Sequence, residues 1–177
     1  MPSPAPHLSL IVPVYNGADR LPSSLEQLRD FLCAQPYASE LILVDDCSND
    51  ETPALLEKFA GGMDTVRLIR NNENRGKGHA VTRGMRAAVG KYRVFTDADL
   101  AYPASEVSKI LADLEGGADV AIACRVLAES RYLMSPTFFS YLYTRHVMSR
   151  LFNAMVRLTL IPHVLDTQAG LKGFTAH

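Results

Sequence analysis

The stretch Tyr92-Arg93-Val94-Phe95-Thr96-Asp97-Ala98-Asp99-Leu100 joins an apolar run to two carboxylates that are one residue apart. The apolar run predicts a buried strand. On an extended strand, residues i and i+2 project to the same side, so Asp97 and Asp99 are expected to point at one spot. Two converging carboxylates at the end of a buried strand are costly without a positive partner, because burial and like charge both disfavour their ionised forms.

A divalent metal ion is one such partner. Mg²⁺ and Mn²⁺ prefer oxygen ligands and usually bridge to a substrate diphosphate instead of filling an all-protein cage. Asp97 and Asp99 are therefore candidate metal ligands. The alternative is a solvated turn in which Asp99 caps the following helix, because three-residue patterns often occur without a metal.

Strands and helices alternate along the chain on both sides of this stretch. Short apolar runs predict strands, and apolar residues at helical spacing predict the helices between them. This alternation indicates an α/β fold, with a Rossmann-like, mostly parallel sheet and helices on both faces. The expected strands cover residues 8–14, 40–44, 66–69, 92–95 and 119–124, and the expected helices cover residues 21–32, 52–60, 79–89 and 103–114.

Polar residues stand where the predicted strands end. In sheets of this kind, ligands bind outside the carboxyl ends of the strands. The residues at those ends are Tyr15, Asp45-Asp46, the loop 74–78, Asp97 to Asp99, and Arg125.

Composition narrows the function classes. The 177 residues are 47% hydrophobic, which is enough for one globular domain with its own core, preceded by a Pro-rich flexible lead at residues 1–7. A net charge of -1 gives no general attraction to nucleic acid. The three cysteines form no CxxC pair, which favours a reducing compartment without structural zinc or disulfides.

No leader or membrane span is predicted. The lead has no apolar core of a secretory signal, and no apolar run approaches the roughly 18 residues of a spanning helix. We therefore expect a cytoplasmic protein, either soluble or in contact with the cytoplasmic face of a membrane. The oligomeric state is left open.

Residues 130–165 differ in composition from the rest of the chain. They contain no Asp or Glu, but they include arginines at 131, 145, 150 and 157 and six aromatic residues. A basic, aromatic segment of this kind suits an anionic membrane surface or a phosphate-bearing lipid. An ordinary packed helix with solvated arginines is the alternative, because the apolar positions that a core needs are also present.

Two nucleotide-binding motifs are excluded. The chain has no GxxxxGK[ST] phosphate loop, and its single GxG, Gly76-Lys77-Gly78, follows the third predicted strand and lacks the third glycine of a dinucleotide fingerprint. An acidic loop, a basic glycine loop and the paired aspartates remain. Together they can hold a base, a diphosphate and a metal.

Four motifs, taken in order, resemble the signatures of the family-two glycosyltransferases, which have the GT-A fold. A fifth, Asp166-Thr167-Gln168-Ala169-Gly170-Leu171-Lys172, is similar to the signature of the dolichyl-phosphate β-glucosyltransferase-like branch of that family, whose members use polyprenyl phosphates as acceptors. An ordered set of motifs is far more specific than any one of them. The four motifs are Leu10-Ile11-Val12-Pro13-Val14-Tyr15-Asn16, Leu43-Val44-Asp45-Asp46-Cys47-Ser48-Asn49-Asp50, Asn74-Arg75-Gly76-Lys77-Gly78-His79-Ala80 and Thr96-Asp97-Ala98-Asp99.

The resemblance implies roles for the matching residues. Pro13 and Tyr15 would lie against the base, Asp45 would accept hydrogen bonds from the base or ribose, and Asp99 would be the principal ligand of Mg²⁺ or Mn²⁺. The full donor-binding set is Pro13, Tyr15, Asp45, Asp46, Asn74, Gly76, Lys77 and Asp97, and the catalytic set is Asp97, Asp99 and Arg125.

A lipid-phosphate acceptor would need cationic partners. A guanidinium group can donate two parallel hydrogen bonds to one phosphate, so arginines are candidates for this role. Their alternative role is in surface ion pairs. The acceptor-binding candidates are Arg125, Arg131, Arg145, Gln168 and Lys172.

The resemblance has two departures. The mannosyltransferase branch resembles Asp-Ala-Asp-Leu-Gln-His-Pro, whereas this chain continues Ala101-Tyr102-Pro103, which favours UDP-glucose over GDP-mannose as the donor. Family members also continue past the position of His177, so a C-terminal part of the family domain is expected to be absent.

Three functions are compatible with the sequence. The first is an inverting, metal-dependent transferase that moves a hexose, most simply glucose from UDP-glucose, onto a polyprenyl or dolichyl phosphate. The second is a transferase of the same fold with a soluble or glycan acceptor, and the third is a truncated domain that binds a nucleotide sugar without turnover.

Overall fold

The computed structural model describes residues 5–125, 148, 151–159 and 164–176. By its internal contacts the chain divides into two units, Met1–Ala121 with Gly170–His177, and Ile122–Ala169.

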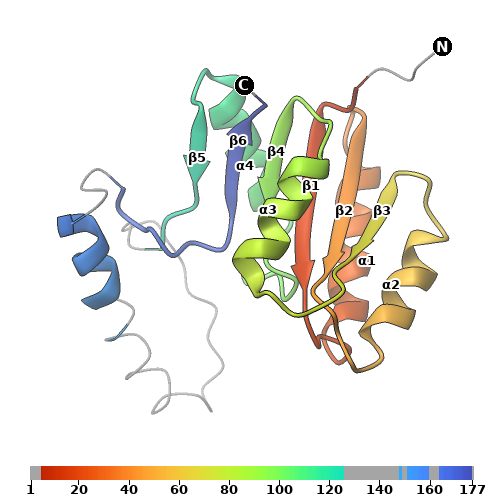
Figure 1. The fold of residues 1–177 in the computed structure, drawn as a ribbon. Coiled ribbons are helices and arrows are strands. Elements are labelled where there is room, and N and C mark those ends of the chain that lie inside the picture. Colours follow the sequence, from red (N-terminus) through yellow and green to blue (C-terminus); the bar gives the residue numbers. More distant parts are fainter. Residues whose placement is uncertain (1–4, 126–147, 149–150, 160–163, 177) are drawn as a thin grey trace. The chain divides into compact units, whose positions relative to one another are not determined.

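The first unit is built on a mixed six-stranded sheet (Figure 1). The strand order is β3-β2-β1-β4-β6-β5, and the β1–β2, β2–β3 and β1–β4 pairs are parallel whereas β4–β6 is antiparallel. The strands are β1 (Leu8–Val14), β2 (Ser39–Asp45), β3 (Val66–Arg70), β4 (Tyr92–Phe95), β5 (Val120–Ile122) and β6 (Lys172–Thr175). The predicted α/β fold with a mostly parallel sheet is confirmed.

Helices lie on both faces of this sheet. Figure 1 shows α3 in front of β1 and α1 behind the sheet. On the face covered by α3, the sheet contributes Ile11, Ile42 and Val44 to a core of fully buried side chains. β1 and β2 are buried along almost their whole length, as is usual for strands that are covered on both faces. The helices are α1 (Leu21–Cys33), α2 (Thr52–Ala60), α3 (Lys77–Ala87) and α4 (Glu106–Glu115).

The loops at the carboxyl ends of three strands turn sharply. Each contains one residue other than glycine with a positive φ: Asn16 (45°) after β1, Cys47 (64°) after β2 and Leu100 (47°) after β4. Such backbone is unfavourable for L residues and is retained mainly where surrounding structure enforces it. These three loops bring polar side chains to one edge of the sheet.

The structure differs from the sequence prediction in three places. The antiparallel strand β6 was not predicted, because Lys172-Gly173-Phe174-Thr175 is short and has a central glycine. β4 ends at Phe95, so Asp97 and Asp99 lie in a turn and not on an extended strand. α3 begins at Lys77, two residues earlier than the periodicity indicated. α4 begins at Glu106, three residues later than the periodicity indicated.

The second unit contains a helix at residues 151–159. None of the helices in the described part of the chain is both long enough and apolar enough to cross a bilayer.

Candidate functional site

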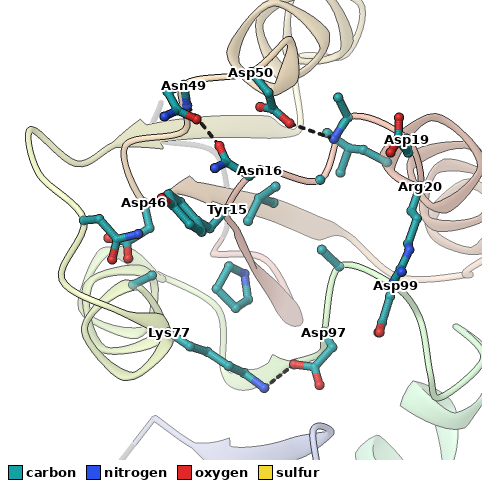
Figure 2. Close-up of a pocket in the computed structure, with 18 of the residues that line it drawn as sticks. Tyr15, Asn16, Asp19, Arg20, Asp46, Asn49, Asp50, Lys77, Asp97 and Asp99 are labelled. Atoms are coloured by element: carbon teal, nitrogen blue, oxygen red, sulfur yellow. Dashed lines mark hydrogen bonds and ion pairs between the residues drawn. The ribbon is translucent and has the colours of Figure 1, made fainter. Parts of the chain in front are cut away.

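A cavity of about 1170 Å³ opens at the carboxyl edge of the sheet in the first unit (Figure 2). Its described lining comes from the end of β1, from the loops after β1, β2, β3 and β4, and from the first turns of α1 and α3. The polar and charged lining residues are Tyr15, Asn16, Asp19, Arg20, Asp46, Asn49, Asp50, Glu51, Asn74, Lys77, Asp97 and Asp99, and Pro13 and Gly76 also line it.

Asp97 lines the cavity and is held from two sides. Figure 2 shows Lys77, the first residue of α3, reaching the Asp97 Oδ1 atom in an ion pair. On its other side, the backbone at Gly170 packs so closely that a Cβ there would lie 2.8 Å from the Asp97 Cγ. The Asp97 side chain is 30% exposed, which leaves part of the carboxylate open to a ligand.

Asp99 is placed by a tight turn. Its Oδ1 atom accepts a hydrogen bond from the Ala101 backbone N–H at 3.1 Å, and Leu100 between them has the positive φ. This is the Asx-type turn that Asp side chains favour. Asp99 is exposed and lines the same cavity as Asp97, although the strand geometry that first suggested their convergence is absent.

Asp46 organises the glycine loop. Its buried carboxylate accepts hydrogen bonds from Asn71 Nδ2 at 2.5 Å, from the Gly76 N–H at 2.7 Å and from the Arg75 N–H at 3.2 Å. Burial by itself raises the pKa of Asp46, but these hydrogen bonds outweigh burial and hold the pKa below its ordinary value. Asp46 is therefore an ionised acceptor that fixes the backbone at the start of α3.

Asp45 takes a different position from its neighbour. It is 1% exposed and is not among the described residues that line the cavity. Its Oδ1 atom accepts a hydrogen bond from the Ser48 N–H at 3.0 Å. Its Oδ2 atom lies 3.2 Å from Arg70 Nε, but not in hydrogen-bond geometry, so this contact is an ion pair only.

Gly76 permits the turn into α3. It has φ 85°, a conformation that glycine adopts without strain, and nothing lies within 4 Å of a Cβ built on it. Its N–H also lies 3.1 Å from the Asn74 Oδ1 acceptor. Asn74, Gly76 and Lys77 line the cavity together, and their role in donor binding stays a prediction.

The loops after β1 and β2 are joined by hydrogen bonds that sequence reasoning missed. Asn16 donates its N–H to Ser48 Oγ at 3.0 Å, and its Oδ1 accepts from the Asn49 N–H at 3.0 Å. Further bonds run from the Gly17 N–H to Thr52 Oγ1 and from the Ala18 N–H to Asp50 Oδ2. Thr52, the first residue of α2, makes no capping hydrogen bond with its side chain and accepts one from the β1 loop instead.

Arg20 is a lining residue without a sequence motif. It is exposed at the start of α1, and Figure 2 shows it extending toward Asp99. The described lining contains six carboxylates and only two cations, Arg20 and Lys77. Lys77 is paired with Asp97, whereas no described carboxylate lies in ion-pair range of Arg20.

Arg125 belongs to the second unit, where Asp166 holds it. Arg125 Nε and Nη2 donate to the two Asp166 carboxylate oxygens at 2.8 and 2.9 Å, and the Arg125 N–H donates to Oδ2 at 3.1 Å. Burial raises the pKa of Asp166, but the bonds from Arg125 outweigh it, and the pKa lies below its ordinary value. The aspartate of the Asp-Thr-Gln motif therefore orients an arginine.

The remaining acceptor candidates are only partly described. Gln168 is exposed, and its N–H donates to Asp166 Oδ1 at 3.1 Å. Lys172 opens β6 and pairs in register with Phe95. Arg131 and Arg145 lie outside the described residues.

The fold and its acidic strand edge define the class. A mostly parallel sheet with an antiparallel strand beside β4, and an Asp-x-Asp turn after β4, is the GT-A fold of the glycosyltransferases. The chain belongs to glycosyl transferase family 2, whose family model matches residues 9–170.

Known proteins agree with this assignment. Dolichyl-phosphate beta-glucosyltransferase of Drosophila melanogaster is 34% identical and that of Dictyostelium discoideum 32%, over 98% and 96% of this chain. The chain spans about half the length of these relatives, 56% and 54%. Glucosyl-3-phosphoglycerate synthase of Mycobacterium tuberculosis, solved with Mn²⁺, UDP and glucosyl-3-phosphoglycerate, has the same fold, with a TM-score of 0.64 and 23% identity over 96% of this chain and 57% of its own.

Proposed function

We propose that this protein is an inverting, metal-dependent glycosyltransferase that moves glucose from UDP-glucose to a polyprenyl or dolichyl phosphate. The observation that carries the proposal is the gathering of Asp46, Lys77, Asp97 and Asp99 around one cavity at the carboxyl edge of a family-two sheet. The glucosyl donor and lipid-phosphate acceptor follow the names of the relatives that match nearly the whole chain.

The donor is expected to lie along the cavity from Tyr15 and Asp46 toward Asp99. Tyr15 is half exposed and offers an aromatic surface to a base beside Pro13. Because Asp46 is held ionised, it accepts but does not donate hydrogen bonds, and this suits the ring N–H of uracil. Asp46, and not Asp45, is the acidic residue that we assign to the donor.

The carboxylates fit a divalent cation. In the described residues, no group of three His, Cys, Asp or Glu side chains forms a closed metal cage, so Asp97 and Asp99 would leave coordination positions for phosphate oxygens. Six lining carboxylates would repel a diphosphate unless a cation offset them. Asp97 and Asp99 would hold Mg²⁺ or Mn²⁺, which when bound would act as a Lewis acid and offset the negative charge of the leaving diphosphate.

The chain's own residues position the donor and stabilise charge. The acceptor phosphate oxygen attacks the anomeric carbon while the bond from that carbon to the diphosphate breaks and UDP leaves, so an α-linked donor gives a β-linked product. A phosphate monoester has a second pKa near 6 and is already largely ionised at neutral pH, so no strong protein base is required. Lys77, which lines the cavity and is paired with Asp97, would contribute positive charge beside the diphosphate.

For the acceptor phosphate we assign Arg125, oriented by Asp166. A guanidinium that is fixed on one side by a carboxylate is preorganised and loses little rotamer entropy when it binds a phosphate. Arg131, Arg145, Gln168 and Lys172 stay predicted acceptor-side residues. Acceptor binding and donor binding are therefore expected to respond to different substitutions.

Calorimetric titration of UDP-glucose, UDP and GDP-mannose, with and without Mn²⁺, tests the donor site. We expect metal-dependent binding of the uridine nucleotides, lost in Asp99→Ala and retained in Asp113→Ala, which removes an exposed carboxylate from α4. Transfer of labelled glucose from UDP-glucose to a polyprenyl phosphate then tests the reaction.

Each contrary outcome has a distinct meaning. Binding without transfer would indicate a donor-binding domain, and transfer only to a soluble sugar acceptor would indicate a different branch of the family. No nucleotide binding by folded protein would contradict the proposal altogether.

A further inference from the structure

Asn71, the first residue after β3, joins two charged side chains of the first unit. Its side chain is 3% exposed, and its backbone N–H donates to the Asp45 carbonyl at 2.8 Å, which fixes the residue beside β2. Asn71 Nδ2 donates to Asp46 Oδ1 at 2.5 Å and also lies 3.4 Å from His79 Nδ1. Asn71 Oδ1 accepts from Arg83 Nη1. A positive and a negative group therefore meet opposite ends of one buried amide.

The charges on both sides select one orientation of this amide. An amide has a donor end and an acceptor end, so a half-turn of the group would place its oxygen against the Asp46 carboxylate and its NH₂ against the Arg83 guanidinium. Both of those contacts are repulsive. Hydrogen bonds to charged groups are the stronger ones, and bonds in a chain reinforce one another. Arg83 and Asp46 therefore stabilise the same orientation of Asn71.

The position of Arg83 is set by the packing of α3 on the sheet. The next residue is Gly84, and a Cβ there would overlap the Ile11 side chain, so α3 lies closer to β1 than any larger residue would allow. Arg83 Nη1 also donates to the Arg70 carbonyl at 2.8 Å. Among the described residues, no carboxylate lies in ion-pair range of Arg83, so Asn71 lies between its charge and that of Asp46.

The bond from Asn71 determines how much of the Asp46 carboxylate is left for a ligand. An ionised carboxylate has about four acceptor positions, and Asn71, Arg75 and Gly76 all donate to this one. Burial raises the pKa of Asp46, and the bond from Asn71 is the largest of the contributions that lower it. Asp46 is 2% exposed and lines the cavity. It can therefore offer a single acceptor in a fixed position.

We propose that Arg83 and Asn71 are positioning residues that set the preference of the donor site for uracil. The inference rests on the proposed function, in which Asp46 accepts the ring N–H of that base. Cytosine has no hydrogen on the corresponding ring nitrogen, so an acceptor fixed at that place discriminates against cytosine. Without Arg83, Asn71 loses one of the two charges that orient it, Asp46 gains freedom and the discrimination falls. Neither residue is among the described residues that line the cavity, so both act through Asp46.

Calorimetric titration of the full chain with UDP and with CDP, in the presence of Mn²⁺, tests the inference. We expect the wild type to bind UDP more tightly than CDP. Arg83→Met removes the donor, so UDP affinity should fall at least about threefold while CDP affinity stays the same, because only part of a charge-assisted bond is transmitted through Asn71. Arg83→Lys keeps a cationic donor and should lie nearer the wild type. Arg86→Met, at another exposed position on α3, is the matched control.

Amide hydrogen exchange in the nucleotide-free protein tests the positioning step without a ligand. The N–H groups of Arg75 and Gly76 donate to Asp46, so their exchange should be faster in Arg83→Met than in Arg86→Met. Equal exchange in these two variants would overturn the inference, whether or not the protein binds nucleotides.

The titrations separate this inference from the proposed function. Equal affinity of the wild type for UDP and CDP, or an unchanged affinity ratio in Arg83→Met, would overturn the inference and leave the proposed function standing. Equal losses of UDP and CDP affinity in Arg83→Met would indicate a general effect on the fold and would also overturn it. No UDP binding by folded wild type would contradict the proposed function, and this inference with it.

Discussion

The backbone of Gly170 is the wall against which the Asp97 carboxylate rests. A Cβ on residue 170 would come within 2.8 Å of the Asp97 Cγ, closer than such atoms lie in real proteins. The conformation of Asp97 therefore requires glycine at the end of the Asp-Thr-Gln-Ala-Gly segment. That segment therefore holds two side chains: Gly170 limits the space around Asp97, and Asp166 binds Arg125.

Gly170→Ala should displace Asp97 and weaken metal-dependent UDP-glucose binding by about tenfold, equivalent to about 1.4 kcal/mol. The added methyl should also cost about 1–3 kcal/mol of unfolding free energy as an overpacking effect. Calorimetric titration and urea denaturation measure the two effects. Gly62→Ala, whose new methyl would make ordinary contacts at 3.5 Å, is the matched control, and wild-type affinity in Gly170→Ala would contradict the prediction.

Asp46→Asn should loosen the glycine loop. An amide has one acceptor oxygen where the carboxylate has two, so at least one of the N–H groups of Arg75, Gly76 and the Asn71 amide loses its partner. Unsatisfied donors of this kind cost about 1–3 kcal/mol. We expect weaker UDP binding together with faster amide hydrogen exchange at residues 75 and 76. Asp45→Asn, changed in the neighbouring carboxylate, should leave exchange at those two amides unaltered.

Arg20→Gln should weaken UDP-glucose binding by about tenfold while leaving uridine binding unchanged, because a charged hydrogen bond to a phosphate contributes about 1.5–3 kcal/mol. Titration with the nucleotide and the nucleoside separates phosphate from base contacts. Arg29→Gln, on α1 and paired with Asp30, is the control. Equal loss for uridine and UDP-glucose would show that Arg20 acts on the fold and not on phosphate.

Glu40 should make the fold acid-sensitive. It is 6% exposed and accepts hydrogen bonds from Ser9 Oγ at 2.5 Å, the Val89 N–H at 2.8 Å and Arg67 at 3.1 Å. Burial raises the pKa of Glu40, but these bonds prevail and the pKa lies below the ordinary value of 4.5. A carboxyl with a lowered pKa stabilises the fold fully above its unfolded pKa, and this contribution is lost as pH falls through the folded pKa.

Urea denaturation at pH 7 and below pH 4 should reveal this dependence. Glu40→Gln should be less stable than the wild type at pH 7 by about 1–3 kcal/mol, and the difference should shrink in acid. Glu57→Gln, at an exposed position on α2, should be neutral. A difference for Glu40→Gln that stays constant with pH would rule out a contribution from ionisation.

Periodicity was sufficient for most of the first unit. The β-branched run of Leu8–Val14 is compatible only with a buried strand, and the leucines of α1 recur at helical spacing. Both elements therefore follow from the sequence. β6 does not, because its four residues pair with β4 across a long stretch of chain, and local pattern carries no information about that partner.

The location of the site could be predicted from the sequence, but the individual side chains that line it could not. Neighbouring residues at a strand end point to different sides, so sequence could not decide between Asp45, the last residue of β2, and Asp46, the first of the loop. Arg20 and Asn16 matched no motif with an assigned role. The place of Asn16 in the lining depends on tertiary hydrogen bonds to a loop that is more than 30 residues away in the chain.

The hydrogen bonds of Asn16 and Gly17 to the loop after β2 have a thermodynamic consequence. Two loops that are already joined by such bonds have little backbone freedom left to lose when a nucleotide arrives. The site would then be preorganised for the base. Binding would carry a small entropic penalty, and its association rate would be set by diffusion and charge. This side of the cavity would then take its final form when the chain folds, before any ligand is present.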